Sequence, residues 1–254
     1  MQVQKLQKEH TDQLETPPQV PTMSFSQAAP PPLPSVAPPP PVVDYAAYTM
    51  LEGSALMFGS TILAGYNGPV TVIGGSENIN LIGLGRGDLT LFAGSGVTIA
   101  HGGSGNNTFV GGDGVNKFFA GPNMNTFVQG EGYNEFHGSS GYSTFIFGQQ
   151  DQVIGGRGPE HLMYSSKASY SDAGYGFIRN LDFVHGDTLD FTMQPDITRE
   201  NMKVVDDELI IKTPDGTLDI YGAGVQIVGV YGSIAAAIAQ GHIVTADYYD
   251  GGKG

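Results

Sequence analysis

The segment Gly102-Gly-Ser-Gly-Asn-Asn-Thr-Phe-Val110 is followed directly by Gly111-Gly-Asp-Gly-Val-Asn-Lys-Phe-Phe119, and the two share one pattern. Each opens on a pair of glycines and places a phenylalanine at its eighth position. The same phenylalanine recurs every nine residues, at Phe109, Phe118, Phe127, Phe136 and Phe145. A fixed internal period indicates an architecture of one stacked structural unit. We therefore expect a repeat fold in this part of the chain.

The nine-residue period also predicts the shape of the unit. A turn that reverses the chain within a few residues needs positive φ angles, which glycine adopts readily. A three-residue strand directs only its middle side chain inward, so one apolar residue in nine is enough for a core. Apolar residues continue this position at Ala64, Ile73, Ile82, Leu91, Ala100, Ile154 and Met163. The predicted fold class is all-β, a parallel β-roll or β-solenoid whose stacked coils bury what single coils cannot.

Composition divides the chain into three zones. Residues 1–43 hold most of the prolines, which predicts a disordered arm that docks a protein partner or acts as a tether. Residues 44–164 carry the repeats, and residues 165–254 are predicted to form a small β-rich C-terminal module. The expected elements of this module are strands at 188–191, 202–205, 208–212 and 217–221 and one short helix at 233–240.

The acidic composition narrows the range of partners. The 254 residues include 25 Asp and Glu against 11 Lys and Arg, a formal net charge of −14. Nucleic acids are bound mainly through Lys and Arg contacts to phosphates, so we expect no nucleic acid partner. No apolar run approaches the roughly 18 residues of a membrane helix, and no membrane insertion is expected. With 0 cysteines, the chain forms no disulfide and has no thiol nucleophile.

The nonapeptides at 102–110 and 111–119 resemble the RTX, or haemolysin-type, repeat Gly-Gly-x-Gly-x-Asp-x-U-x, in which U is apolar. The resemblance is close over residues 102–146 and degenerate outside them. Residues 179–191 also resemble the module that follows such repeats in secreted bacterial proteins. The resemblance implies a parallel β-roll with calcium in its turns and export by a type I secretion system. It slightly favours a secreted or cell-surface location, with a cytoplasmic scaffold as the alternative.

The chain departs from the RTX pattern at the sixth position, where the family carries the aspartate that ligates calcium. Asparagine stands at five of these positions, Asn80, Asn107, Asn116, Asn125 and Asn134. An amide oxygen can coordinate calcium but cannot neutralise it, whereas stacked amides can hydrogen-bond to one another along a rod. We therefore expect an asparagine ladder and no required cofactor. Asp113 and Glu131 lie 18 residues apart on one edge and are predicted to bind calcium weakly at most, with a partially calcium-loaded roll as the alternative.

Residues beside the core position predict the outer faces of the roll. One face repeats a threonine and an apolar residue over four coils, at Thr90, Phe92, Thr108, Val110, Thr126, Val128, Thr144 and Ile146. The other face is mixed and charged. The threonine face is a candidate surface for self-association, for a polysaccharide chain or for ice, unless the C-terminal module or a sister chain covers it. Open strand edges at the ends of the roll are a second candidate for assembly.

The sequence contains no recognised catalytic motif. Asp182, Asp187 and Asp190 cluster near His185, a combination found in acid–base and metal chemistry, but the Gly186–Asp187 turn favours a structural role. The sequence thus predicts a non-enzymatic, self-assembling, RTX-like bacterial structural protein. Two alternatives remain open, namely a secreted calcium-dependent RTX adhesin or matrix protein and a polysaccharide-associated scaffold.

Overall fold

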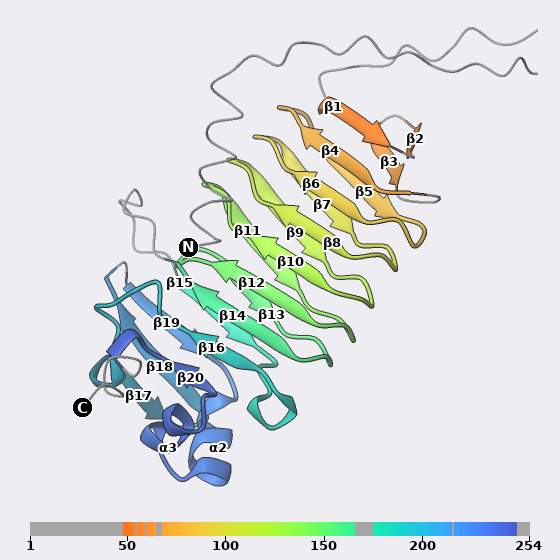
Figure 1. The fold of residues 1–254 in the computed structure, drawn as a ribbon. Helices are drawn as coiled ribbons and strands as arrows, with labels where there is room; N and C mark the ends of the chain where they lie inside the picture. The colour runs from red at the N-terminus through yellow and green to blue at the C-terminus, as the bar shows by residue number, and fades with distance from the viewer. Residues whose placement is uncertain are drawn as a thin grey trace, which may run out of the picture. The chain divides into compact units, whose positions relative to one another are not determined.

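The computed structural model describes residues 48–53, 55–58, 60–64, 68–165, 175–214 and 216–247. The chain divides into two units, Met1–Val42 and Val43–Gly254. The first unit, and with it the predicted proline-rich arm, lies outside the described residues. The second unit is a β-solenoid built from two long sheets (Figure 1). The predicted all-β class and parallel β-roll architecture are therefore confirmed.

Successive strands alternate between the two sheets, so each coil contributes one strand to each sheet. Sheet A contains, in spatial order, β1 (Tyr48–Gly53), β4 (Val70–Gly74), β6 (Leu89–Phe92), β8 (Asn107–Val110), β10 (Asn125–Val128), β12 (Ser143–Phe147), β14 (Glu160–Tyr164), β16 (Thr188–Asp190) and β20 (Ile243–Val244). Sheet B contains β2 (Ala55–Phe58), β3 (Thr61–Ala64), β5 (Ile79–Gly83), β7 (Val97–His101), β9 (Val115–Phe119), β11 (Tyr133–His137), β13 (Gln152–Ile154), β15 (Tyr175–Arg179), β19 (Gly216–Ile220), β18 (Glu208–Thr213) and β17 (Met202–Val205).

The repeated phenylalanines form the core of the central coils. All five are fully buried. Phe109, Phe127 and Phe145 point inward from sheet A and stack on one another, with ring centroids 5.4 and 4.8 Å apart. Phe118 and Phe136 from sheet B pack between them, with centroids 5.2 to 6.3 Å from the sheet A rings. The nine-residue spacing thus produces one continuous aromatic column.

The predicted register is wrong at both ends of the repeat region. Upstream, Val72 and Leu81 are fully buried, whereas the predicted core residues Ile73 and Ile82 are only half-buried. Downstream, the buried residues are Val153 and Leu162, and the predicted Ile154 and Met163 flank them on the outer face.

Coil length accounts for this register error. Strand partners are 18 residues apart in the central coils, as for Leu89 and Asn107, but 19 apart for Val70 and Leu89 and 17 apart for Ser143 and Glu160. A one-residue change in a turn moves the inward position of the following strand by one residue, because strand side chains alternate between faces. The period therefore predicts the core only where all turns have equal length.

Residues 165–254 continue both sheets. Strand β15 pairs in parallel with β13, β19 with β15, β16 with β14 and β20 with β16. The antiparallel strands β17 and β18 extend sheet B beyond β19. The helical elements are η1 (Phe183–His185), η2 (Arg199–Asn201), α2 (Ala223–Gln226), the π-helix η3 (Ile227–Tyr231) and α3 (Ile234–Ala239). Helix α3 begins after Ser233, whose hydroxyl accepts the amide of Ala236.

The two ends of the solenoid differ from its middle. At one end, β1 pairs antiparallel with β4 and β2 pairs antiparallel with β3. At the other end lie the antiparallel β17–β18–β19 strands and helices α2 and α3 (Figure 1). A second roll therefore cannot extend the parallel stack in the same register at either end. In the described part of the chain, no helix has the length and apolar character needed to cross a membrane.

The coil spacing leaves no room for side chains on several turn glycines. A Cβ atom on Gly132 would collide with the carbonyl group of Gly114 and lie 2.7 Å from the carbonyl oxygen of Asp113, in the preceding coil. We expect Gly132→Ala to lower the free energy of unfolding by about 2 kcal/mol or more, the scale of an overpacked core. Gly229→Ala is the matched control because nothing lies within 4 Å of that position. Urea unfolding that leaves the two variants equally stable would contradict this packing account.

Candidate functional site

Two buried columns of polar side chains run along the solenoid. In sheet A, Asn107 and Asn125 are directly aligned and 2 % exposed. The Asn107 Nδ2 group donates to Asn125 Oδ1 at 2.9 Å and to the carbonyl oxygens of Gly103 and Gly105 at 3.1 and 2.9 Å. Its Oδ1 atom accepts the amide of Gly103 at 3.1 Å. Each amide therefore closes its own turn and also joins adjacent coils.

Sheet B carries the equivalent column. The Asn116 Nδ2 group donates to Asn134 Oδ1 at 3.0 Å, and Asn134 Nδ2 donates to Asp151 Oδ1 at 2.8 Å. The other carboxylate oxygen of Asp151 accepts the amide of Gly148 at 2.8 Å. Both asparagines are fully buried and Asp151 is 2 % exposed. The column thus ends on a carboxylate that an amide and a backbone N–H stabilise.

Asn80 lies outside both columns. It is half-buried on β5, where its neighbour Ile79 takes the inward position at 3 % exposure. The 19-residue coils upstream cause this, because they move the inward position by one residue. The structure therefore brings together four of the five predicted ladder residues, as two pairs on opposite sheets.

The predicted weak calcium residues, Asp113 and Glu131, are exposed in turns of the same edge. Among the described residues, no group of three or more His, Asp or Glu side chains has the arrangement of a metal site. Calcium affinity rises with the number of carboxylate ligands, so two exposed carboxylates offer little to a hard cation.

The threonine face lies on the outer side of sheet A. Its threonines form one row across β6, β8, β10 and β12, and the apolar residues form a second row on the same strands. The four threonines, Phe92 and Val110 are half-buried, whereas Val128 is only 4 % exposed and Ile146 only 3 %. Accessible apolar surface on this face is therefore concentrated on β6 and β8.

The outer face of sheet B carries a stacked row that the sequence analysis missed. Phe119 lies between His101 and His137, with both ring centroids 4.4 Å away. Lys117 Nζ is 2.7 Å from Glu135 Oε1, which also contacts His137 Nε2 at 2.5 Å. Burial alone would raise the pKa of Glu135, but hydrogen bonds and charges from Lys117 and His137 outweigh it and lower that pKa. The 18-residue spacing of the three rings was the available signal.

The carboxylates near His185 separate into different environments. Asp187 is 2 % exposed and accepts the backbone amides of Glu160 at 2.9 Å and Asp182 at 2.6 Å. Burial is the largest cause that raises the pKa of Asp187 to about 6, against the effect of these two hydrogen bonds. Asp190 instead contacts His161 Nε2 at 3.1 Å on the outer face of sheet A. The cluster expected from the sequence is therefore divided between two sites.

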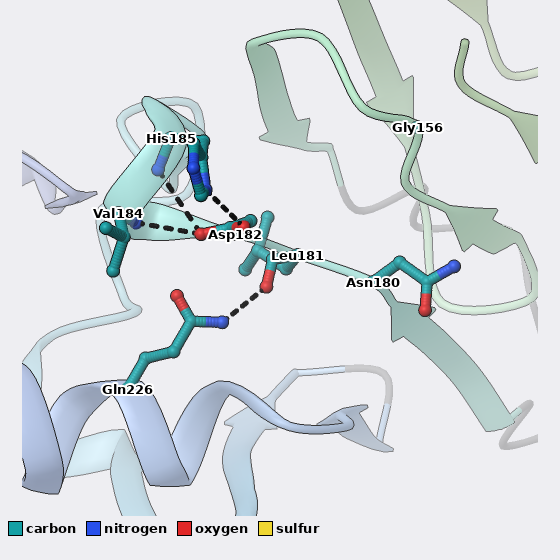
Figure 2. Close-up of a pocket in the computed structure, with 7 residues that line it drawn as sticks. All are labelled: Gly156, Asn180, Leu181, Asp182, Val184, His185 and Gln226. Atoms are coloured by element: carbon teal, nitrogen blue, oxygen red, sulfur yellow. Dashed lines mark hydrogen bonds and ion pairs between the residues drawn. The ribbon is translucent and has the colours of Figure 1, made fainter. Parts of the chain in front are cut away.

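Asp182 and His185 line a shallow pocket beside η1 (Figure 2). The Asp182 carboxylate accepts the amides of Val184 and His185 at 3.1 and 3.2 Å, and its other oxygen contacts His185 Nδ1 at 2.6 Å. Gln226 closes the opposite side by donating to the Leu181 carbonyl at 2.6 Å. Every one of these contacts caps or anchors the turn, which gives the pair a clear structural role.

Comparison of the chain with protein-family models, with curated proteins and with solved structures finds no match. Arguments about function therefore depend on the geometry of the solenoid itself.

Proposed function

We propose that this chain is a non-enzymatic structural repeat protein whose roll is held by amide ladders and needs no calcium. The observation that supports this most is the pair of buried asparagine columns. At the position where RTX-like repeats carry a calcium-binding carboxylate, the amides Asn107–Asn125 and Asn116–Asn134 bond directly to each other at 2.9 and 3.0 Å. A neutral amide supplies both donor and acceptor, so a stack of amides needs no cation for charge balance.

We further propose that self-association, where it occurs, is lateral. The antiparallel strands at both ends interrupt parallel stacking of one roll on another. Long edge-free faces remain, and sheet A presents half-buried Phe92 and Val110 beside a regular row of threonines. Exposed apolar rows on a flat sheet favour packing against a second flat surface.

The bacterial, RTX-like origin and export by a type I system belong to the same proposal and rest on the nonapeptides at residues 102–119. The secreted, calcium-dependent adhesin and the polysaccharide-associated scaffold are the alternatives. Calcium-dependent folding would favour the first alternative. Retention on an insoluble polysaccharide would favour the second.

Lateral association is tested by placing charge on the accessible part of the threonine face. We expect sedimentation velocity in EDTA to show concentration-dependent association of the wild type and a monomer for the double variant Thr108→Glu/Val110→Glu. The control Ile99→Glu places a charge at a 38 % exposed position on the outer side of sheet B and should still associate. A wild type that stays monomeric at every concentration would overturn lateral assembly.

A further inference from the structure

Glu160 occupies an unusual position for a carboxylate. As the first residue of β14 it aligns with Ser143, and so it continues the sheet A column that contains Asn107 and Asn125. Its side chain is 0 % exposed. The Oε1 atom accepts the amide of Gly156 at 2.5 Å, while Oε2 has no hydrogen-bond partner among the described residues.

The walls of this site leave little space for a counterion. A Cβ atom on Gly138 would collide with Glu160 Oε1, and a Cβ atom on Gly155 would lie 2.7 Å from Oε2. The carboxyl group therefore fills the volume that these two glycines leave. The hydroxyl of Ser143, the next side chain along the column, is likewise buried and without a partner in the described part of the chain.

The charged groups around Glu160 do not compensate a negative charge. Asp187, which accepts the Glu160 amide, is the nearest and has the same sign, and Asp182 lies behind it. Arg157 in the adjoining turn is exposed, and His185 is bound to Asp182. On β14 itself, His161 faces the outer side and contacts Asp190, and no described Lys, Arg or His forms an ion pair with Glu160.

We propose that Glu160 keeps its proton in the folded protein and acts as a pH-sensitive lock between the last ladder coil and the C-terminal strands. Protonated, the carboxyl has an O–H donor and resembles the amides above it in the column. Ionised, it is a buried charge beside Asp187, and such a charge without a partner is strongly unfavourable. The segment 181–187 docks on the amide of Glu160 through Asp187, so that segment should loosen first.

The direction of the pH effect follows from the same environment. Burial is the largest cause that raises the pKa of Glu160 to about 8, and the charge of Asp187 adds to it against the Gly156 hydrogen bond. In the unfolded chain the ordinary value is 4.5. The folded state therefore binds the proton more tightly, and the stability that this supplies is complete below about pH 4.5 and is lost as pH rises through 8.

Chemical unfolding of the full chain from pH 5 to pH 9 tests the proposal. For the wild type, we expect the unfolding constant to rise by up to about tenfold per pH unit below pH 8, the slope of one linked proton. Glu160→Gln should remove most of this slope, because glutamine keeps the shape and cannot ionise. The control Glu77→Gln, at an exposed turn position, should keep the wild-type slope.

Hydrogen exchange of the wild type gives an independent readout if Glu160→Gln fails to fold. We expect the amides of Glu160 and Asp182 to lose protection between pH 6 and pH 9, after correction for the intrinsic rate, while that of Phe127 stays protected. Equal pH slopes for wild type and Glu160→Gln would overturn the proposal. So would a slope that calcium abolishes in the wild type alone, since the site would then hold a cation and not a proton.

Discussion

Replacing Asn107 and Asn125 together by aspartate should unfold the roll at neutral pH in the absence of calcium. The Nδ2 groups of these residues donate to the carbonyl oxygens of Gly103, Gly105, Gly121 and Asn123. Carboxylates can make none of these bonds. They would also place two negative oxygens at the 2.9 Å separation that the Asn107–Asn125 hydrogen bond has now.

The expected loss is large compared with the stability of a domain of this size. Leaving a buried charge without a partner costs roughly 3–5 kcal/mol. Two such charges in one column approach the whole 5–15 kcal/mol by which proteins are typically stable. Circular dichroism and urea unfolding in EDTA will measure the effect. Partial recovery on adding calcium would agree with the account, because two facing carboxylates are what the cation needs.

The variant Asn78→Asp/Asn180→Asp is the matched control. It changes the net charge equally but at two exposed positions. Asn78 uses its Oδ1 atom to accept the Val97 amide at 2.9 Å, a bond that aspartate retains. We expect this control to remain folded. A ladder variant as stable as this control in EDTA would show that the amide column does not hold the roll.

The second large effect is expected at the centre of the aromatic column. Phe127 is fully buried, and its ring centroid lies 5.4, 5.4 and 4.8 Å from those of Phe109, Phe136 and Phe145. Phe127→Ala removes packing on both sides of the column and leaves a cavity that flanking strands cannot close. We expect a loss of about 3–5 kcal/mol in the free energy of unfolding.

Phe119→Ala is the control for this experiment because it removes an equal side chain from the outer face of sheet B. Phe119 stacks between His101 and His137 but is only half-buried, so we expect a loss of about 1 kcal/mol. Phe127→Leu should fall between the two, since leucine fills part of the cavity. Equal losses for Phe127→Ala and Phe119→Ala would contradict the assignment of the aromatic core.

The central coils could be predicted from the sequence because their turns have equal length. Within residues 102–146 the period of nine places each phenylalanine inward and aligns each asparagine with its partner one coil away. Outside this range, coils of 19 and 17 residues change the register. The exchange of Ile82 for Leu81 shows why, since adjacent aliphatic residues give periodicity no means of choosing between them.

The features that the sequence analysis missed depend on contacts between distant residues. Glu160 joins the sheet A column only because one coil is a residue short, and its burial depends on Gly138, Gly155 and the turn that Asp187 anchors. The antiparallel ends arise where strands β1 and β17 reverse direction, which a repeat pattern does not encode. Period therefore predicts the middle of a solenoid better than its ends.

The most direct test of the central claim is far-UV circular dichroism of the purified protein in EDTA, followed by thermal unfolding with and without about 10 mM calcium, well above the range of weak extracellular sites. A roll held by amide ladders should give a complete β spectrum in EDTA and the same melting temperature in both conditions. A disordered spectrum in EDTA that becomes β-rich only when calcium is added would contradict it.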